Sequence, residues 1–447
     1  MHRTKTGSYW MGALAALSLA ALGAGPAMAQ ATAAAPKPLS ANDVSILFPF
    51  PTKHSDLANL IALADFSGPT GPTKSRLWSD ADFARFLQIA TGDDGKVAGS
   101  SSRIELPQEA KQIGNWFIAG IRFDPGAPGL SPAIIEKLGQ QPQIRFIAQP
   151  VTKNADGSVE VHDIAAHLIY SFTASLKDPE QPGCLKRSVP NDDAFKAVVR
   201  DLVVLRNQLE HGAFNSTRVL TTGPMNVHPG LKGRTAVPFR NALKAMLEKH
   251  LAPPRLTSMA IMGLDTPEPW IFVAMQKVEP VPGSGQFVFV PVPGPTLHNK
   301  QVAQMLNFRG GDIVQPAPKT NNQNDITCRH DAFQPTLPDE NRKGVATADF
   351  FNGTRNPSEV KRIIDIIADP VKSHFFNTDC VSCHTDTRQG LRLVRGFTVP
   401  GVAPEVLPKD DWNVRNFGWF DRPTITRRTA TETAEVVTFI NKNLLGR

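Results

Sequence analysis

Five consecutive residues near the C-terminus, Cys380-Val381-Ser382-Cys383-His384, form the most specific chemical pattern in the sequence. Residues three positions apart on a helix lie on the same side of it, one turn apart, so Cys380 and Cys383 can present both thiols together. Two thiols at this spacing can add across the two vinyl groups of a porphyrin and form two thioether bonds. The neighbouring imidazole of His384 can then bind the iron as its proximal ligand. The pattern therefore predicts one covalently attached haem c.

The other two cysteines of the chain are Cys184 and Cys328. In an oxidising compartment we expect them to form a disulfide with each other. A zinc site is the alternative, because four residues have the types that bind zinc: Cys328, His330, Cys380 and Cys383. A zinc site gives no role to His384 or Cys184, so haem attachment is the leading hypothesis.

C-type haem is attached outside the cytoplasm, and residues 1–29 have the features of an export signal. Arg3 and Lys5 form a short basic start, and an apolar run follows from Met11 to about Ala24. Ala27-Met28-Ala29 then supplies the small residues that a signal peptidase recognises, so we expect cleavage after Ala29. An uncleaved N-terminal membrane anchor is the alternative, although the apolar run is short for a bilayer span. We expect a bacterial periplasmic protein with no integral membrane segment after cleavage.

The charge of the chain is mildly basic. The formal net charge is +7, and it falls to +5 when Arg3 and Lys5 leave with the signal peptide. No block of like charge stands out, which argues against nucleic-acid binding. The sequence also shows no Ser-His-Asp signature, phosphate-binding loop or dinucleotide fingerprint. These observations leave the haem motif as the main guide to function.

The 447-residue chain is long enough for two or three domains. The Ala/Pro-rich residues 30–38 are typical of a flexible lead-in, and residues 39–355 are expected to form a larger body of unknown role. Helical spacing of apolar residues occurs in segments 80–89, 191–209 and 238–250. Runs rich in β-branched and aromatic residues indicate strands at 116–123, 144–149, 159–172, 257–264, 270–278 and 286–290. Their order predicts an antiparallel α+β body, with a hairpin turn at residues 154–157.

Two amphipathic helices are predicted on either side of the haem motif. The first covers residues 358–368 and is followed by Pro370, which cannot continue a helix. The second is expected to begin with a capping box, Thr429 to Glu432. Helical spacing places four apolar residues of the second helix on one face: Ala434, Val437, Ile440 and Leu444.

Residues 356–447, roughly the last fifth of the chain, resemble a class I cytochrome c domain. The resemblance rests on the helix before the motif, the early position of the motif and the C-terminal amphipathic helix. It implies a small, mostly α-helical domain in which the terminal helix packs against the helix before the motif. In such domains this packing shields the haem edge from water.

The sequence departs from this family at the second axial ligand of the iron, which is usually a Met downstream of the motif. The last methionine of the chain is Met305, which precedes the motif. The distal ligand must therefore come from elsewhere or be absent, and the residues considered are His298, Met305, His330 and His374. A Met ligand raises the reduction potential, whereas an open iron site permits small-ligand binding. The sequence leaves the distal ligand unknown.

Two groups of side chains after the motif can act around a haem. Three arginines recur at helical spacing, and we expect one to pair with a haem propionate while the others form a solvated face or dock an acidic partner: Arg388, Arg392 and Arg395. Four aromatic residues can exclude water from a haem or pack as ordinary core: Trp412, Phe417, Trp419 and Phe420.

The leading interpretation is a periplasmic monohaem c-type cytochrome that transfers electrons, with the larger body docking a partner or another module. The alternatives are a haem enzyme, such as a peroxidase, or a gas or redox sensor with an open distal iron site. Bacterial c-type peroxidases of the familiar kind use two haems, whereas this chain has one attachment motif. We therefore expect an electron-transfer protein rather than a catalyst, with a redox partner protein and no nucleic acid among its partners.

Overall fold

A computed structural model divides the chain into two units, Met1–Lys37 and Pro38–Arg447. All of the residues that the structure describes lie in the second unit. They are residues 38–66, 77–91, 106–126, 141–177, 185–190, 192–264, 270–278, 284, 288–291, 303–304, 306–307, 312–313, 356–373, 380–409 and 413–446. The expected signal peptide, and all of the expected lead-in except Pro38, lie outside these ranges.

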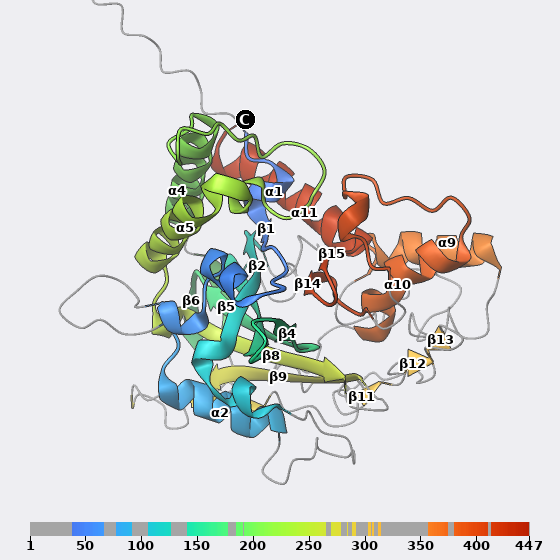
Figure 1. The fold of residues 1–447 in the computed structure, drawn as a ribbon, viewed down its shortest axis with the longest axis horizontal. Coiled ribbons are helices and arrows are strands. Elements are labelled where there is room, and N and C mark those ends of the chain that lie inside the picture. Colours follow the sequence, from blue (N-terminus) through green and yellow to red (C-terminus); the bar gives the residue numbers. More distant parts are fainter. Residues whose placement is uncertain are drawn as a thin grey trace, which may run out of the picture. The chain divides into compact units, whose positions relative to one another are not determined.

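The main sheet is antiparallel throughout and has nine strands within the described ranges (Figure 1). Its strands are β1 (Ser45–Leu47), β2 (Trp116–Asp124), β3 (Gln143–Lys153), β4 (Val159–Val161), β5 (Ile164–Ser171), β8 (Leu256–Leu264), β9 (Trp270–Val278), β10 (Val288–Pro291) and β11 (Ala303–Gln304). The strand order is β1-β2-β3-β5-β8-β9-β10, with β4 paired to β3 and β11 paired to β9. Two-stranded pairs are formed by β6 (Thr173–Lys177) with β7 (Leu185–Pro190), β12 (Leu306–Asn307) with β13 (Asp312–Ile313), and β14 (Phe417–Trp419) with β15 (Pro423–Ile425).

Helices accompany this sheet, so the described residues have a mixed α+β fold. The α-helices are α1 (Ala41–Val44), α2 (Asp80–Thr91), α4 (Asp192–Glu210), α5 (Ala236–His250), α9 (Pro357–Ile367), α10 (Cys380–Leu393) and α11 (Arg427–Phe439). Short 3-10 helices cover His54–Asn59, Leu63–Asp65, Gln108–Lys111, Ile113–Asn115, Pro229–Leu231, Gly233–Thr235, Pro253–Arg255 and Pro404–Val406, and a π-helical turn at Ile440–Leu444 extends α11. None of the helices in the described ranges combines the length and the apolar character needed to cross a membrane.

Most of the predicted elements are confirmed. The helices predicted at 80–89, 191–209, 238–250 and 358–368 correspond to α2, α4, α5 and α9. Residues 154–157 form the turn between β3 and β4. The single strand predicted at 159–172 is wrong, because it is divided into β4 and β5 at His162 and Asp163. The amide of Ile164 donates to the carbonyl of His162 at 2.8 Å, and this tight local turn interrupts the strand.

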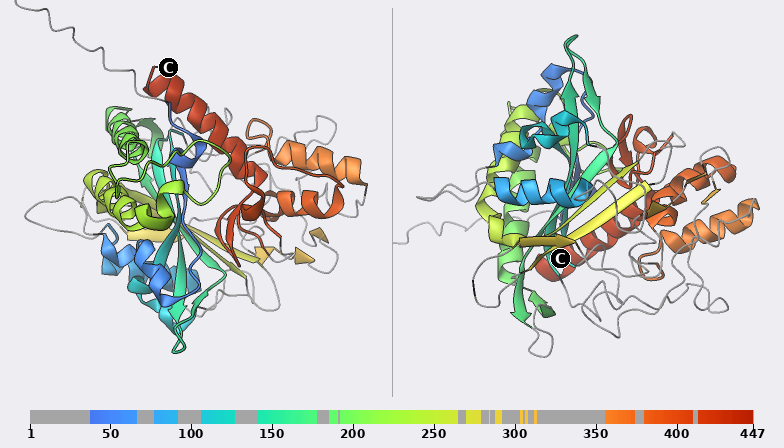
Figure 2. Two further views of the ribbon diagram at one scale, coloured as in Figure 1. Left: turned by 45° about the horizontal axis from the view of Figure 1, so that its top comes forward. Right: turned by 90° about the horizontal axis from the view of Figure 1, so that it is seen from below.

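One face of the sheet is apolar and is covered by α4 and α5 (Figure 2). On this face, the ring of Phe146 in β3 lies 5.4 Å from that of Phe66 and 5.2 Å from that of Tyr170 in β5. Phe172, just after β5, contacts Phe195 of α4, with 5.7 Å between ring centroids. Burial of these aromatic rings removes a large apolar area from water and stabilises the packing of helices on the sheet.

The opposite face of the sheet carries polar residues, and Figure 2 shows the C-terminal segment on that side. In an antiparallel pair, directly opposed residues point to the same face. Arg122 of β2 lies opposite Arg145 of β3, and Ile147 of β3 lies opposite His167 of β5. These four side chains therefore belong to one face, which we call the polar face. Two arginines directly across from each other require negative groups nearby, since like charges in such pairs are destabilising.

Close contact between the polar face and β14 requires a glycine at position 120. A Cβ atom added to Gly120 would lie 2.5 Å from Cε1 of Phe417, a side chain that is only 6% exposed. We therefore predict that Gly120→Ala lowers the free energy of unfolding by about 1–3 kcal/mol through overpacking. Urea unfolding followed by circular dichroism measures this loss.

The matched control is Gly114→Ala, since a Cβ atom at Gly114 meets no other atom within 4 Å. We expect this control to be neutral or slightly stabilising, because alanine restricts the unfolded chain. Equal stability of the two variants would contradict the packing of Phe417 on the sheet.

Candidate functional site

The haem motif occupies the start of α10, so Cys380 and Cys383 are one helical turn apart along the backbone. The preceding helix, α9, begins where the side chain of Asn356 accepts a hydrogen bond from the amide of Ser358 at 3.0 Å, with Pro357 in the first helical position. The buried residues of α9 are Val360, Ile363, Ile364, Ile366 and Ile367. These residues form the apolar side expected of an amphipathic helix, and α9 packs against α10.

His384 is held in one orientation by a backbone carbonyl. Its Nδ1 atom lies 2.7 Å from the carbonyl oxygen of Val414. Because a carbonyl oxygen can only accept, Nδ1 must carry the proton, and the lone pair of the neutral ring is on Nε2. Burial lowers the pKa of His384 to about 4, although the Val414 carbonyl raises it. The imidazole is therefore neutral at physiological pH, with the tautomer that a metal ligand bound through Nε2 needs.

The residues around Val414 connect the motif to the rest of the chain. Asn416 directs its side-chain amide at the sulfur of Cys383, with 4.0 Å between Nδ2 and Sγ. The backbone carbonyl of Asn416 accepts from the amide of Thr426 and from the hydroxyl of Thr429, each at 2.9 Å. One residue thus contacts both the motif and the first turn of α11.

Helix α11 begins earlier than the sequence predicts. Its N-cap is Thr426, whose hydroxyl accepts from the amide of Thr429. The hydroxyl of Thr387 in α10 also accepts from the amide of Arg427 at 2.8 Å. The predicted capping box from Thr429 to Glu432 is therefore wrong, because Glu432 is drawn into ion pairs away from the helix end.

The buried side of α11 is also different from the predicted one. Of the four predicted apolar residues, Ile440 is buried, Val437 and Leu444 are half-buried, and Ala434 is exposed. The buried residues of α11 are mostly polar: Arg428, Thr429, Ala430, Glu432, Thr433 and Val436. The buried side of α11 is polar because it lies against the polar face of the sheet, whose arginine side chains need polar partners.

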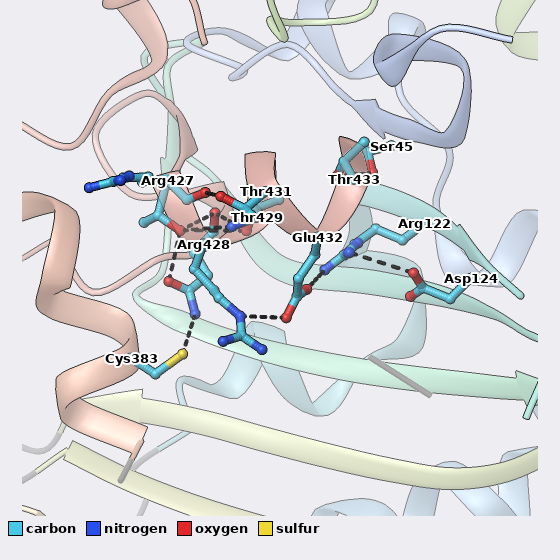
Figure 3. Close-up of polar contacts among 12 residues, drawn as sticks. Ser45, Arg122, Asp124, Cys383, Arg427, Arg428, Thr429, Thr431, Glu432 and Thr433 are labelled. Atoms are coloured by element: carbon cyan, nitrogen blue, oxygen red, sulfur yellow. Dashed lines mark hydrogen bonds and ion pairs between the residues drawn. The ribbon is translucent and has the colours of Figure 1, made fainter. Parts of the chain in front are cut away.

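A buried ion-pair series joins α11 to the sheet (Figure 3). Glu432 lies between two arginines, with its carboxylate 2.7 Å from Nε of Arg428 and 2.9 Å from Nη1 of Arg122. Arg122 also lies 3.5 Å from Asp124. The two arginines hold the pKa of Glu432 at about 2, against the effect of its burial. We call these four residues the charge cluster.

Arg428 extends the charge cluster to α9. Its Nη1 atom donates to the carbonyl of Ile367 at 2.8 Å and to that of Ser373 at 2.7 Å. A cation at the carbonyl end of a helix is favoured by the helix dipole. The terminal helix therefore reaches the end of α9 through a polar contact of Arg428, whereas the helix that packs along α9 is α10.

Several guanidinium nitrogens near the motif are shielded from solvent and have no hydrogen-bond partner among the described residues. They are Nε of Arg145, Nη1 of Arg415 and Nε of Arg122. Arg415 otherwise pairs with Asp163 and donates to the carbonyl of Trp419. Unpaired buried donors are costly, so this arrangement fits an anionic ligand such as the two propionates of haem.

Sequence reasoning missed His167, which lies on the polar face in β5. Burial lowers the pKa of His167 well below its usual value, and the guanidinium groups of Arg145 and Arg415 lower it further. Strand register places His167 on the same face of the sheet as Arg145. The available signal was its residue type, because His167 is the one histidine in the otherwise mostly apolar strand Ile164–Ser171.

Most of the other predicted site residues lie outside the described side chains, and the rest are either exposed or buried. The expected disulfide residues, the considered distal ligands and one aromatic residue lie outside the described side chains: Cys184, Cys328, His298, Met305, His330, His374 and Trp412. Arg392 and Arg395 are exposed, as expected for a solvated face, whereas Arg388 is buried. Trp419 is buried against the body and donates from its ring to the carbonyl of Phe48 at 3.0 Å.

Comparisons with known proteins give no family for this chain. No family model matches it, and neither a curated protein nor a solved structure shows a match. Among the described residues, no group of three or more His, Cys, Asp and Glu side chains is arranged to hold a metal ion by itself. The site is therefore interpreted from its own residues.

The charge cluster predicts a specific loss of stability in acid. We expect Glu432→Gln to lower the free energy of unfolding at pH 7 by about 3–5 kcal/mol, because Arg122 and Arg428 lose a buried counter-charge. The pKa of Glu432 is about 2 in the folded chain, against an ordinary value of 4.5 for a glutamate. Its stabilising contribution is therefore complete above about pH 4.5 and is lost as the pH falls towards 2. Urea unfolding at pH 7, 4.5 and 3 measures this contribution.

Glu435→Gln is the control, since Glu435 lies on the same helix, is half-buried and has its pKa raised rather than lowered. We expect little change in the control at pH 7. If wild type and Glu432→Gln lost the same stability between pH 4.5 and 3, the ion pairs would not be responsible for the pH dependence.

Proposed function

We propose that this chain is an exported, periplasmic c-type cytochrome with one covalent haem, and that it transfers electrons. The thiols of Cys380 and Cys383 would hold the porphyrin, and Nε2 of His384 would bind the iron. The observation that carries the proposal is the hydrogen bond from His384 Nδ1 to the Val414 carbonyl. A ligating histidine is usually fixed in this way by a second group on its other nitrogen.

The surroundings of the motif support the same proposal. The shielded donors of Arg145 and Arg415 are available to anionic oxygens, which two haem propionates supply. The body contributes Arg145, and the segment after the motif contributes Arg415. A cofactor held between them would thus contact both parts of the unit.

The protein residues have three tasks in this proposal. Val414 orients the His384 ring, while Phe417 and Trp419, both buried, keep water from the polar face. The guanidinium groups of Arg145 and Arg415 balance negative charge. When bound, a haem supplies one-electron redox chemistry at its iron.

An acidic redox protein is the partner that the surface favours. Arg392 and Arg395 lie at the exposed end of the α10 region. Positive side chains near a redox centre can steer an acidic partner by long-range attraction, which weakens as salt is added. We therefore propose a docking partner with an acidic patch around its own redox centre.

Mass spectrometry and metal analysis test haem attachment directly. The protein is produced in a bacterium that attaches haem to exported chains, and the mature protein is expected to begin after Ala29. We predict that its mass exceeds that of the polypeptide by one haem, with one iron per chain. The double variant Cys380→Ala/Cys383→Ala is expected to lose this added mass because both thioethers are absent.

The control separates haem from the zinc alternative. The variant Cys328→Ser/His330→Ala removes two of the four residues that a zinc site would use and leaves the haem motif intact. We expect it to keep the covalent haem. A wild-type protein that contains zinc and no iron, or a mass equal to its polypeptide alone, would refute the proposed function.

Carbon monoxide distinguishes electron transfer from the alternative functions. An iron with two protein ligands is expected to remain low-spin and to bind carbon monoxide poorly, which suits electron transfer. Absorption spectra of the reduced protein, with and without carbon monoxide, measure this. A high-spin iron that binds carbon monoxide readily would favour the haem-enzyme or sensor alternatives.

A further inference from the structure

The strand register places His167 on the side of the sheet that the motif-bearing segment covers. His167 of β5 is paired with Ile147 of β3 and with Ala260 of β8. A Cβ atom added to Gly418 of β14 would lie 3.4 Å from the Cγ2 atom of Ile147. Since opposed residues share a face, His167 lies beside the position that β14 covers.

Contacts on both sides of this position fix how the segment lies on the sheet. The amide of Trp419 donates to Oε1 of Gln149 at 2.7 Å, and Nε2 of Gln149 donates to the Trp419 carbonyl at 3.0 Å. On the other side, Glu432 pairs with Arg122. His384 is attached to the same segment through Val414. The segment that orients the His384 ring therefore covers the polar face, on which His167 also lies.

Burial and the guanidinium groups of Arg145, Arg415 and Arg122 disfavour the protonated ring of His167. Among the described residues, His167 makes no side-chain hydrogen bond to another protein group. A neutral imidazole is the form that binds metal ions.

We propose that the imidazole of His167 would be the distal protein ligand of a bound haem iron, in addition to His384. This inference rests on the proposed function, because it requires a haem at the motif. It also assigns a role to the larger body, whose sheet would supply the second ligand that the segment after the motif lacks. Coordination by two imidazoles gives a lower reduction potential than coordination by Met and His.

The variant His167→Ala tests this assignment in the exported protein. Haem content is measured after denaturation, and the spin state of the iron is measured in the native protein by absorption and electron paramagnetic resonance spectroscopy. We expect His167→Ala to keep its covalent haem, to change from low-spin to high-spin iron and to bind carbon monoxide. Added imidazole is expected to restore the low-spin spectrum, because it replaces the missing ring.

His162→Ala is the matched control. His162 lies five positions earlier at the start of the same strand region, and its ring nitrogen lies 2.6 Å from the Thr152 hydroxyl. We expect this control to keep the wild-type spectrum. The variant His167→Met provides a second test in case the alanine variant fails to fold, since a Met ligand is expected to raise the reduction potential.

The outcomes separate this inference from the proposed function. If wild type carries covalent haem but His167→Ala keeps its low-spin spectrum and its resistance to carbon monoxide, another residue is the distal ligand. If wild-type iron is already high-spin, the distal site is open and the assignment is wrong. If wild type carries no covalent haem, the proposed function itself fails.

Discussion

The buried ion pair between Glu432 and Arg122 is the interaction on which the rest of the site depends. It joins α11 to β2 across 310 residues of sequence. Glu432 also pairs with Arg428, which in turn holds the carbonyls of Ile367 and Ser373. Loss of the carboxylate would leave the buried Arg428 without its carboxylate partner and Arg122 with Asp124 alone, which is far more costly than loss of an exposed ion pair. One carboxylate thus keeps the terminal helix, the end of α9 and the sheet together.

The two faces of the sheet explain why the site lies where it does. The apolar face is covered by α4 and α5 and needs no polar partner. The polar face carries arginines that must be compensated when a chain segment covers them. Glu432 and Asp124 compensate Arg122, but Arg145 makes no hydrogen bond or close ion pair within the described residues. Because the positive charge of Arg145 has no close negative partner among the described residues, this face suits an anionic cofactor better than a direct contact with protein alone.

Sequence patterns predicted the local elements well because their causes are local. Helices α2, α4, α5 and α9 follow from apolar periodicity. The motif of Cys380, Cys383 and His384 is recognised from the spacing of its residues alone. The start of α11 was mispredicted because Thr429 and Glu432 match a capping box, while the actual cap is Thr426 and Glu432 binds a strand far away in sequence. His167 could not be assigned either. Its neighbours are set by strand register and by docking of the C-terminal segment, and neither leaves a pattern near His167 itself.

Coordination of iron by one imidazole from α10 and one from β5 would make the cofactor a link between the two parts of the unit. Binding to the folded state alone stabilises that state, so docking of the segment on the sheet and occupation of the site would favour each other. The surrounding arginines would act on the same iron. Their positive charge favours the reduced state, which carries one less positive charge, whereas a second imidazole favours the oxidised state relative to a Met ligand. The larger body would then set the reduction potential through two opposing effects, Arg145 and His167, both on the polar face of its sheet.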